Sequence, residues 1–463
     1  MNVIISFMNN HTKFIKRCGN MFDGFCKQFK VLMFLVWLLP ALSIFGQNPE
    51  PTVITSDIDN FWVAYDRITQ TKDSAVQYEY LNNLFIEKAS PGQRAMMELK
   101  RYTPKSYVEV INRYPLFWNS IRANTLRSKT LAAGLKADIA KLKILYPDLK
   151  PAKIYFTIGA LNSGGTIKDG MVLIGSEIAM TDQHTVSSEL PDEYKHLKSY
   201  FDGNPIGNIA FTNVHEYVHT QQKTTDGSTL LAQSVLEGVA EFVAVKATGK
   251  PSTLAAMAYA RANDERIKQR FTAQMFNPFA GFWLYSNAAN EFNARDLGYY
   301  VGYAICEKYY AKTKDKKRSI SEMINLNYND SAQLGKFIER SGYFKKSVKK
   351  LEVDFERSRP YVVGIKPFKN GATDVDPTIG EITIEFSAPM DKKFRNFSYG
   401  PLGENNSLKV KKFKSLSEDG KSLTLEIELK PKHRQQLTVA QGFRSVEGIS
   451  LKPYIVDITT NGN

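Results

Sequence analysis

The feature that most constrains this chain is a pair of histidines four residues apart. The stretch FTNVHEYVHTQQ (211–222) carries His215 and His219, and Glu216 directly follows the first histidine. Residues at i and i+4 share one face of a helix, so both imidazoles can reach one ion. Glu216 is offset by one residue, so it can stand beside such an ion without ligating it. The alternative is an ordinary amphipathic helix that carries two hydrogen-bonded histidines.

A second helix favours the metal interpretation. The stretch VLEGVAEF places Glu237 and Glu241 four residues apart, and Glu237 follows His219 by eighteen residues. A hydrolytic zinc site needs three protein ligands, and an antiparallel return helix would bring Glu237 to the ion. Glu241, one turn further on, can accept the free N–H of a ligand histidine. A solvated helix face is the alternative, but the neighbouring residues are too apolar for full exposure.

Taken together, the HExxH motif and the later Glu-Gly-x-Ala-Glu resemble the gluzincin metallopeptidases. The resemblance implies that His215, His219 and Glu237 bind Zn²⁺ and that Glu216 is the general base. It also implies a tyrosine that stabilises the oxyanion, as in the zinc aminopeptidases, where the pattern is Tyr-x-x-Gly. The sequence LGYYVGYAI supplies Tyr299 at the matching position, with Tyr300 and Tyr303 as rivals within about one helical turn.

Roughly residues 150–345 are also similar to a bacterial family of predicted zinc-dependent proteases with unassigned substrates, and this is the closer resemblance. The chain departs from the aminopeptidases, because its GALNSGG stretch (159–165) has no glutamate to anchor a substrate amine. Gly164 and Gly165 in that stretch would instead let an extended peptide pair closely with an edge strand. We expect them to bind substrate.

The periodicity predicts an α+β fold in consecutive regions. Apolar residues at helical spacing fill 54–146, two β-rich runs occupy 152–160 and 170–178 around a glycine-containing turn, and further helices follow to about 357. Beyond that point short alternating runs indicate a β-sandwich of about one hundred residues, which resembles bacterial Ig-like domains. The expected units are a helical region (47–149), a zincin-like core (150–357) and an Ig-like domain (358–463).

The N-terminus predicts export. Two lysines precede an apolar run of signal-peptide length within residues 1–46, and an uncleaved membrane anchor is the alternative. Residues 1–46 hold five basic residues and one acidic residue, so their removal lowers the net charge from +14 to +10. The remaining basic runs are scattered, so nucleic acid is not an expected partner. Cys306 would then be the only cysteine, which excludes an internal disulfide.

The expected function is that of an exported zinc metallopeptidase in the periplasm, at the cell surface or in the medium. It would hydrolyse peptides or proteins with a metal-activated water, and it would not stay inserted in a membrane after signal cleavage. The alternatives are a non-catalytic binding protein on the same scaffold and a zinc hydrolase with another substrate. The aromatic stretch 276–287 is expected to be mainly core, and His184 and His196 incidental. Oligomeric state and cleavage specificity stay open.

Overall fold

The computed structural model of this protein describes residues 52–252 and 254–462. The predicted signal peptide, together with Cys18 and Cys26, lies outside the described residues. Within the described part of the chain, no helix combines the length and the apolar character needed to cross a membrane.

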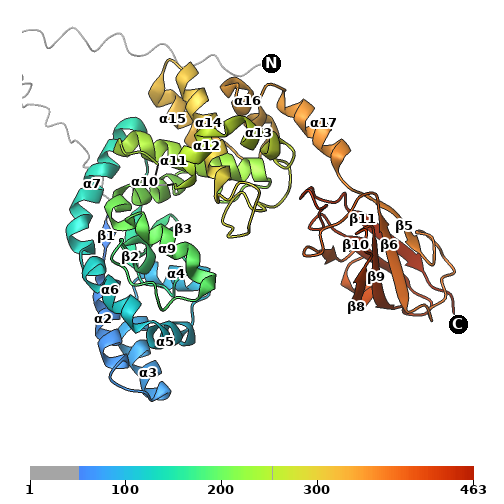
Figure 1. Ribbon diagram of the computed structural model, residues 1–463, viewed down its shortest axis with the longest axis horizontal. Coiled ribbons are helices and arrows are strands. Elements are labelled where there is room, and N and C mark those ends of the chain that lie inside the picture. The colour runs from blue at the N-terminus through green and yellow to red at the C-terminus, as the bar shows by residue number, and fades with distance from the viewer. Residues whose placement is uncertain (1–51, 253, 463) are drawn as a thin grey trace, which may run out of the picture. The chain divides into compact units, whose positions relative to one another are not determined.

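Residues 56–145 are helical, as the apolar spacing predicts (Figure 1). Proline or a polar cap begins several of these helices, because the N–H that proline lacks would have no partner in the first turn. Pro115, for example, begins a new helix directly after the preceding one has ended. The helices are α2 (Ser56–Ile68), α3 (Ser74–Leu81), the π-helical turn η1 (Asn82–Ile86), α4 (Pro91–Lys100), α5 (Pro104–Arg113), α6 (Pro115–Leu126) and α7 (Ser128–Leu145).

A small sheet follows, with strand order β1-β2-β4-β3. Its strands are β1 (Val53–Ile54), β2 (Lys153–Thr157), β3 (Thr166–Lys168) and β4 (Met171–Gly175). The first, second and fourth are parallel, whereas β3 pairs antiparallel with β4 and forms an edge. The expected strand over 170–178 is therefore shorter than predicted, because its end turns into helix α8 (Ser176–Ala179). The expected turn before it contains β3.

Helices then continue to residue 358. They are α9 (Lys195–Asp202), α10 (Ile209–His219), α11 (Leu230–Thr248), α12 (Ala256–Ala262), α13 (Asp264–Thr272), α14 (Leu297–Lys312), α15 (Lys316–Ile324), α16 (Ser331–Ser341) and α17 (Val348–Ser358), with 3₁₀ turns η2 (Asp192–Tyr194) and η3 (Pro205–Asn208). Helix α11 ends at Gly249, whose φ of +68° suits a glycine. Its N-cap is Thr229, whose side chain accepts from the Ala232 N–H.

Two glycines bring α11 and α14 into direct backbone contact. A Cβ on Gly302 would lie 1.8 Å from the Ser234 carbonyl oxygen, and one on Gly238 would lie 2.1 Å from the Gly302 carbonyl carbon. Only glycine permits this approach. One continuous hydrophobic core joins these helices to the small sheet and to the N-terminal helices. The two helices that carry the predicted glutamates and tyrosines are thus packed backbone against backbone.

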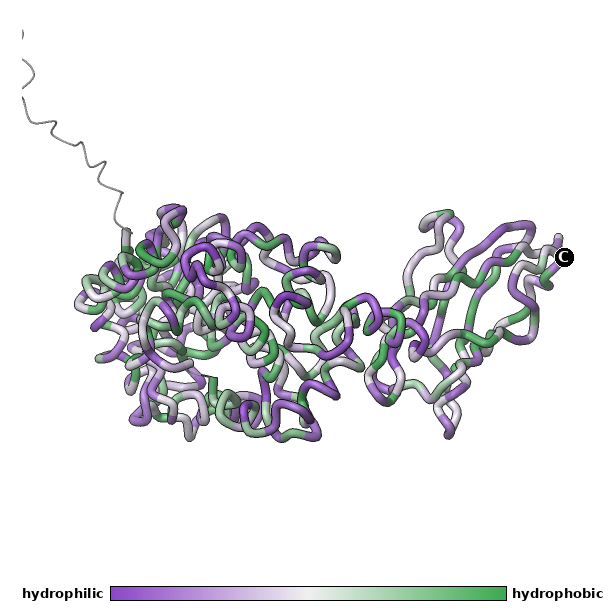
Figure 2. Tube along the Cα trace, turned by 90° about the horizontal axis from the view of Figure 1, so that it is seen from above, coloured by the Kyte–Doolittle hydropathy of each residue, from purple (hydrophilic) through white to green (hydrophobic). Residues whose placement is uncertain are grey.

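The C-terminal part is built from strands, as predicted, and has a hydrophobic core of its own. One sheet has the order β5-β6-β9-β8 and the other β11-β10-β7, with all pairs antiparallel. The elements are β5 (Val362–Lys366), β6 (Glu381–Phe386), β7 (Phe397–Ser398), η4 (Glu404–Asn406), β8 (Lys409–Leu416), β9 (Ser422–Glu428), β10 (Arg434–Val439) and β11 (Tyr454–Thr459). Buried residues alternate along β6 and β9, and Figure 2 shows the corresponding hydrophobic stretches in green. The Ig-like assignment and an independent domain from 358 stay predictions.

Candidate active site

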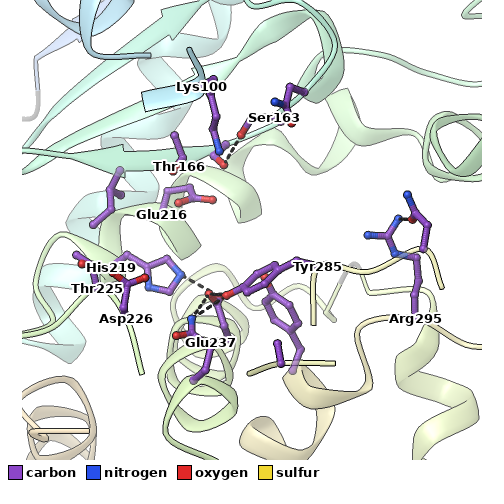
Figure 3. Close-up of a pocket in the computed structure, with 18 of the residues that line it drawn as sticks. Lys100, Ser163, Thr166, Glu216, His219, Thr225, Asp226, Glu237, Tyr285 and Arg295 are labelled. Atoms are coloured by element: carbon purple, nitrogen blue, oxygen red, sulfur yellow. Dashed lines mark hydrogen bonds and ion pairs between the residues drawn. The ribbon is translucent and has the colours of Figure 1, made fainter. Parts of the chain in front are cut away.

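A pocket of about 1070 Å³ contains the histidines and glutamates that the sequence singled out (Figure 3). Its walls come from the end of α4, the loop that precedes β3, helices α10 and α11, the segment 278–287 and the start of α14. These segments are far apart in the sequence. The described chain therefore gathers the candidate residues from both its sheet and its helices.

Three of the predicted ligands converge at the bottom of this pocket. His215 and His219 stand on α10, and Glu237 stands on α11; each offers one ligand atom, and these atoms lie within 4.8 Å of one another. Nε2 of His219 is 3.0 Å from Nε2 of His215 and 3.2 Å from Oε2 of Glu237, and the third separation is 3.4 Å. Tetrahedral zinc with metal–ligand distances near 2.0–2.1 Å would separate its ligands by about 3.4 Å. The spacing fits such an ion.

The partner of His219 fixes which of its nitrogens carries the proton. Gln222 Nε2 donates to the carbonyl of Leu236 and to the hydroxyl of Tyr328, both at 2.9 Å. Its amide oxygen therefore faces Nδ1 of His219, at 2.7 Å. An amide oxygen only accepts, so His219 carries its proton on Nδ1 and presents a lone pair at Nε2.

His215 has an equivalent partner in Glu241. Nδ1 of His215 lies 3.0 Å from Oε2 of Glu241, and the other oxygen of that carboxylate accepts from the hydroxyl of Ser252. The Glu241 side chain is only 3% exposed. This carboxylate places the His215 proton on Nδ1 as well. Neutral imidazoles would thus direct two Nε2 lone pairs at each other and at the Glu237 carboxylate, an arrangement that needs a positive charge in its centre.

The second oxygen of Glu237 is held by neutral groups. Oε1 accepts from the hydroxyl of Tyr285 and, at 3.3 Å, from Nε2 of Gln233. The Gln233 amide also donates to the Tyr285 hydroxyl at 2.8 Å. Because these contacts engage Oε1, the Glu237 carboxylate keeps Oε2 turned toward the histidines. Tyr285 and Gln233 were not identified from the sequence.

The pKa values of the cluster reflect its concentrated charge. Burial lowers the pKa of His215, but Glu237 and Glu241 outweigh it and raise that pKa well above its usual value. Burial also lowers the pKa of His219, but the Glu237 carboxylate outweighs this effect, so the pKa of His219 is raised as well. Burial opposes ionisation of Glu237, yet the two histidines hold its pKa well below the usual range. These shifts favour positive charge beside the Glu237 carboxylate, which a bound divalent cation would supply.

Glu216 lies beside the cluster and outside it, as its offset on the helix predicts. Its carboxylate lines the pocket, and Figure 3 shows it between Glu237 on one side and Thr166 and Lys100 on the other. Burial raises the pKa of Glu216, although His219 and His215 partly offset this effect. A carboxyl group with a raised pKa is suited to take up a proton and release it again.

The loop before β3 comes very close to Glu216. A Cβ on Gly165 would lie 2.9 Å from Oε1 of Glu216, and one on Gly164 would lie 3.3 Å from Ile178. A buried carboxylate, Glu177, shapes this loop from below by accepting from the backbone N–H of Gly159 at 2.9 Å and that of Leu161 at 3.3 Å. Gly164 and Gly165 line the pocket, and their role in substrate binding stays a prediction. Glu177 fell within an expected strand, so the sequence did not suggest this role.

The three candidate tyrosines lie in different surroundings. Tyr299 lines the pocket, and its ring centre is 6.2 Å from that of His215. Tyr300 instead donates to Asp264 at 3.0 Å, and Tyr303 packs edge-on against Phe242. Burial raises the pKa of Tyr299 well above its usual value, and Glu237 adds to this shift, so its hydroxyl stays a hydrogen-bond donor. Tyr299 is the one of the three that faces the candidate ligands.

One sequence expectation needs correction. Phe279, Tyr285 and other members of the stretch 276–287 line the pocket, although Trp283 within it is core as expected. His196 also lines the pocket, where it lies 3.1 Å from the Asn287 amide, and its incidental role stays a prediction. No spacing signal marks these residues, because they enter the pocket from loops whose path depends on the tertiary fold.

Comparison with known proteins gives a match to one protease family model. Residues 117–333 match a family model described as "Predicted Zn-dependent protease (DUF2268)", and this range contains both histidines, Glu216, Glu237, Glu241 and Tyr299. No curated protein matches the chain. One matching solved structure is the crystal structure of the S-layer protein rSbsC(31-844), at 10% identity, 88% coverage of this chain and a TM-score of 0.17. The chain spans 44% of that protein's length, and so low a score carries no argument.

Proposed function

We propose that this chain is an exported zinc-dependent metallopeptidase. The observation that carries the proposal is the mutual orientation of His215, His219 and Glu237, whose lone pairs meet at one point because Gln222 and Glu241 hold the opposite edges of the imidazoles. The match of residues 117–333 to a family of predicted zinc-dependent proteases supports the same class. Export rests on the apolar run within residues 1–46.

Bound zinc would polarise the substrate carbonyl and make a water molecule more acidic. Glu216 would take the proton from the attacking water and pass it to the departing amine. Tyr299 would donate its hydroxyl proton in a hydrogen bond to the carbonyl oxygen as that oxygen gains negative charge. The edge strand β3 and the glycines before it would hold an extended peptide across these groups by backbone pairing.

Glu216 distinguishes this function from a non-catalytic binding role. A scaffold that only binds a partner has no use for a carboxyl group beside the ligands, whereas hydrolysis requires it. We expect Glu216→Gln to keep its zinc and to lose cleavage of a casein or mixed-peptide substrate. Equal cleavage by the variant and the parent protein would contradict the proposal.

Metal content is the first measurement to make. Elemental analysis of the mature chain should give one zinc per molecule, and Glu237→Ala should lose it or bind it far more weakly. A chain without stoichiometric zinc after purification in zinc-containing buffer would contradict the metal site and favour the binding-protein alternative.

A further inference from the structure

Lys100 is an ammonium group that the peptidase chemistry described above does not use. It is the last residue of α4, it is half-buried, and it lines the same pocket as Glu216 and Glu237. Figure 3 shows its side chain reaching into the pocket above Glu216 and Thr166. Lys100 also lies outside the matched range 117–333, so the comparison assigns it no role.

Lys100 has no hydrogen-bond or ion-pair partner among the described residues. Its nearest acid in the sequence, Glu98, is engaged by Lys168 of β3 at 2.5 Å. Glu216 is close enough to influence Lys100, but no hydrogen bond or ion pair joins the two groups in residues 52–252 and 254–462. Burial lowers the pKa of Lys100, and the charge on nearby Glu216 partly offsets this decrease. A partly desolvated cation without a partner is costly unless something else binds it.

The cation on the other side of the pocket, Arg295, has partners within the chain. Arg295 is also a lining cation, but its guanidinium donates to Asp296 at 2.9 Å and to Asn287 at 2.6 Å. Arg101, which follows Lys100 in a left-handed conformation with φ of +56°, adds a second cation to the wall near Lys100. Among the described residues, Lys100 and Arg101 therefore place two cations without an ion-pair partner on one wall, near the glycine loop, where Glu216 is a neighbouring acid.

We propose that Lys100 selects peptides that carry an aspartate or glutamate side chain next to the cleaved bond. An extended peptide paired with β3 would run past Gly165 and Thr166, and a carboxylate on it would meet the Lys100 ammonium. Such a charged hydrogen bond discriminates by about 10- to 100-fold against a neutral side chain. The inference rests on the proposed function, whose substrate class it narrows to acidic peptides.

A fluorogenic peptide library tests it. At each position around the scissile bond the peptides carry Glu, Gln or Lys, and kcat/KM is measured for the parent protein, Lys100→Met and Lys100→Glu. We expect one position at which the parent protein prefers Glu over Gln by about tenfold or more. Lys100→Met should lose that preference, and Lys100→Glu should reverse it toward Lys. Lys105→Glu, an exposed change outside the pocket, should leave the preference intact.

Two results would overturn the assignment. One is the absence of any preference for Glu in the parent protein. The other is a uniform loss of activity on all peptides in Lys100→Met, which would make Lys100 a counter-ion for Glu216 with no part in selectivity. In either case cleavage of neutral peptides would still uphold the proposed peptidase.

A binding measurement tests the acidic-peptide site independently of peptide cleavage. Zinc-loaded Glu216→Gln is titrated into a fluorescein-labelled peptide of alternating Glu and Ala, and into its Gln analogue, with and without Lys100→Met. Tighter binding of the Glu peptide that depends on Lys100 supports the acidic site even if the parent protein cleaves nothing. Equal binding of both peptides, together with no cleavage, would overturn both proposals.

Discussion

Glu241 and His215 form a buried pair in which Oε2 of the carboxylate lies 3.0 Å from Nδ1 of the imidazole. The pair joins two helices, α10 and α11, whose sequences are separated by a turn. Because the carboxylate faces the N–H at Nδ1, the other nitrogen of His215 is turned toward His219 and Glu237 with its lone pair available. The geometry of the proposed metal site thus depends on a residue that does not ligate the metal.

Replacing Glu241 by glutamine should weaken zinc binding by about 10- to 100-fold, because the amide accepts less strongly and orients the imidazole less firmly. The zinc dissociation constant can be measured by competition with a chromophoric chelator. Glu307→Gln is the matched control, since Glu307 pairs with Arg261 at the surface of α14. A variant at position 241 with unchanged zinc affinity would show that the pair is only structural.

Replacing Tyr299 by phenylalanine should lower kcat by about 10²- to 10³-fold, the usual cost of losing one oxyanion donor. The zinc content should stay at one per chain, because the hydroxyl is not among the ligand atoms. Tyr300→Phe is the matched control: its hydroxyl bonds to Asp264 outside the pocket. If Tyr300→Phe lost as much activity as Tyr299→Phe, the assignment would be wrong.

Spacing along single helices was enough to predict the candidate ligands. The two histidines, and likewise the two glutamates, are four residues apart (His215 and His219, Glu237 and Glu241). This spacing puts each pair on one face of its helix in any fold that packs the two helices together. The α+β class and the small sheet were predicted from changes of period and are confirmed. Tyr299 was singled out only by resemblance, and its rivals could not be separated until the direction of each side chain was known.

The rest of the pocket depends on tertiary structure. Lys100 stands at the end of α4, where no pattern singled it out, and Tyr285 lies in a loop with a left-handed backbone, with φ of +58°. Glu177 was assigned to a strand, although its carboxylate accepts from the backbone of the loop before β3. No periodic pattern marks such residues, because their positions are set by which segments pack together and not by their neighbours in the sequence.

Replacing Gly302 by alanine should destabilise the protein by about 1–3 kcal/mol or more. The added Cβ would meet the Ser234 carbonyl oxygen at 1.8 Å, so α11 and α14 would have to separate. Gly134→Ala is the matched control in the exposed part of α7, where nothing lies within 4 Å. There alanine should raise stability by about 0.5–1 kcal/mol. Urea unfolding of both variants measures the difference, and equal effects would contradict the tight helix contact.

The stability of the protein should also fall as the pH rises through the range in which Glu177 ionises. Burial raises the pKa of this carboxyl group from about 4.5 to about 7, although hydrogen bonds from the Gly159 and Leu161 backbones oppose the shift. The folded protein therefore holds this proton more tightly than the unfolded chain does. Its stabilising effect is complete below the unfolded pKa and is lost as the pH rises through the folded pKa.

Glu177→Gln isolates this effect, because glutamine fills the same space and does not titrate. The free energy of unfolding of the parent protein relative to the variant should fall by about 3 kcal/mol between about pH 4.5 and pH 8. Urea titrations at a series of pH values measure it. Both proteins share the same metal site, so the pH dependence of metal binding cancels in the difference. Parallel pH profiles for the two proteins would contradict the prediction, because they would show that the pKa of Glu177 is the same in the folded protein and in the unfolded chain.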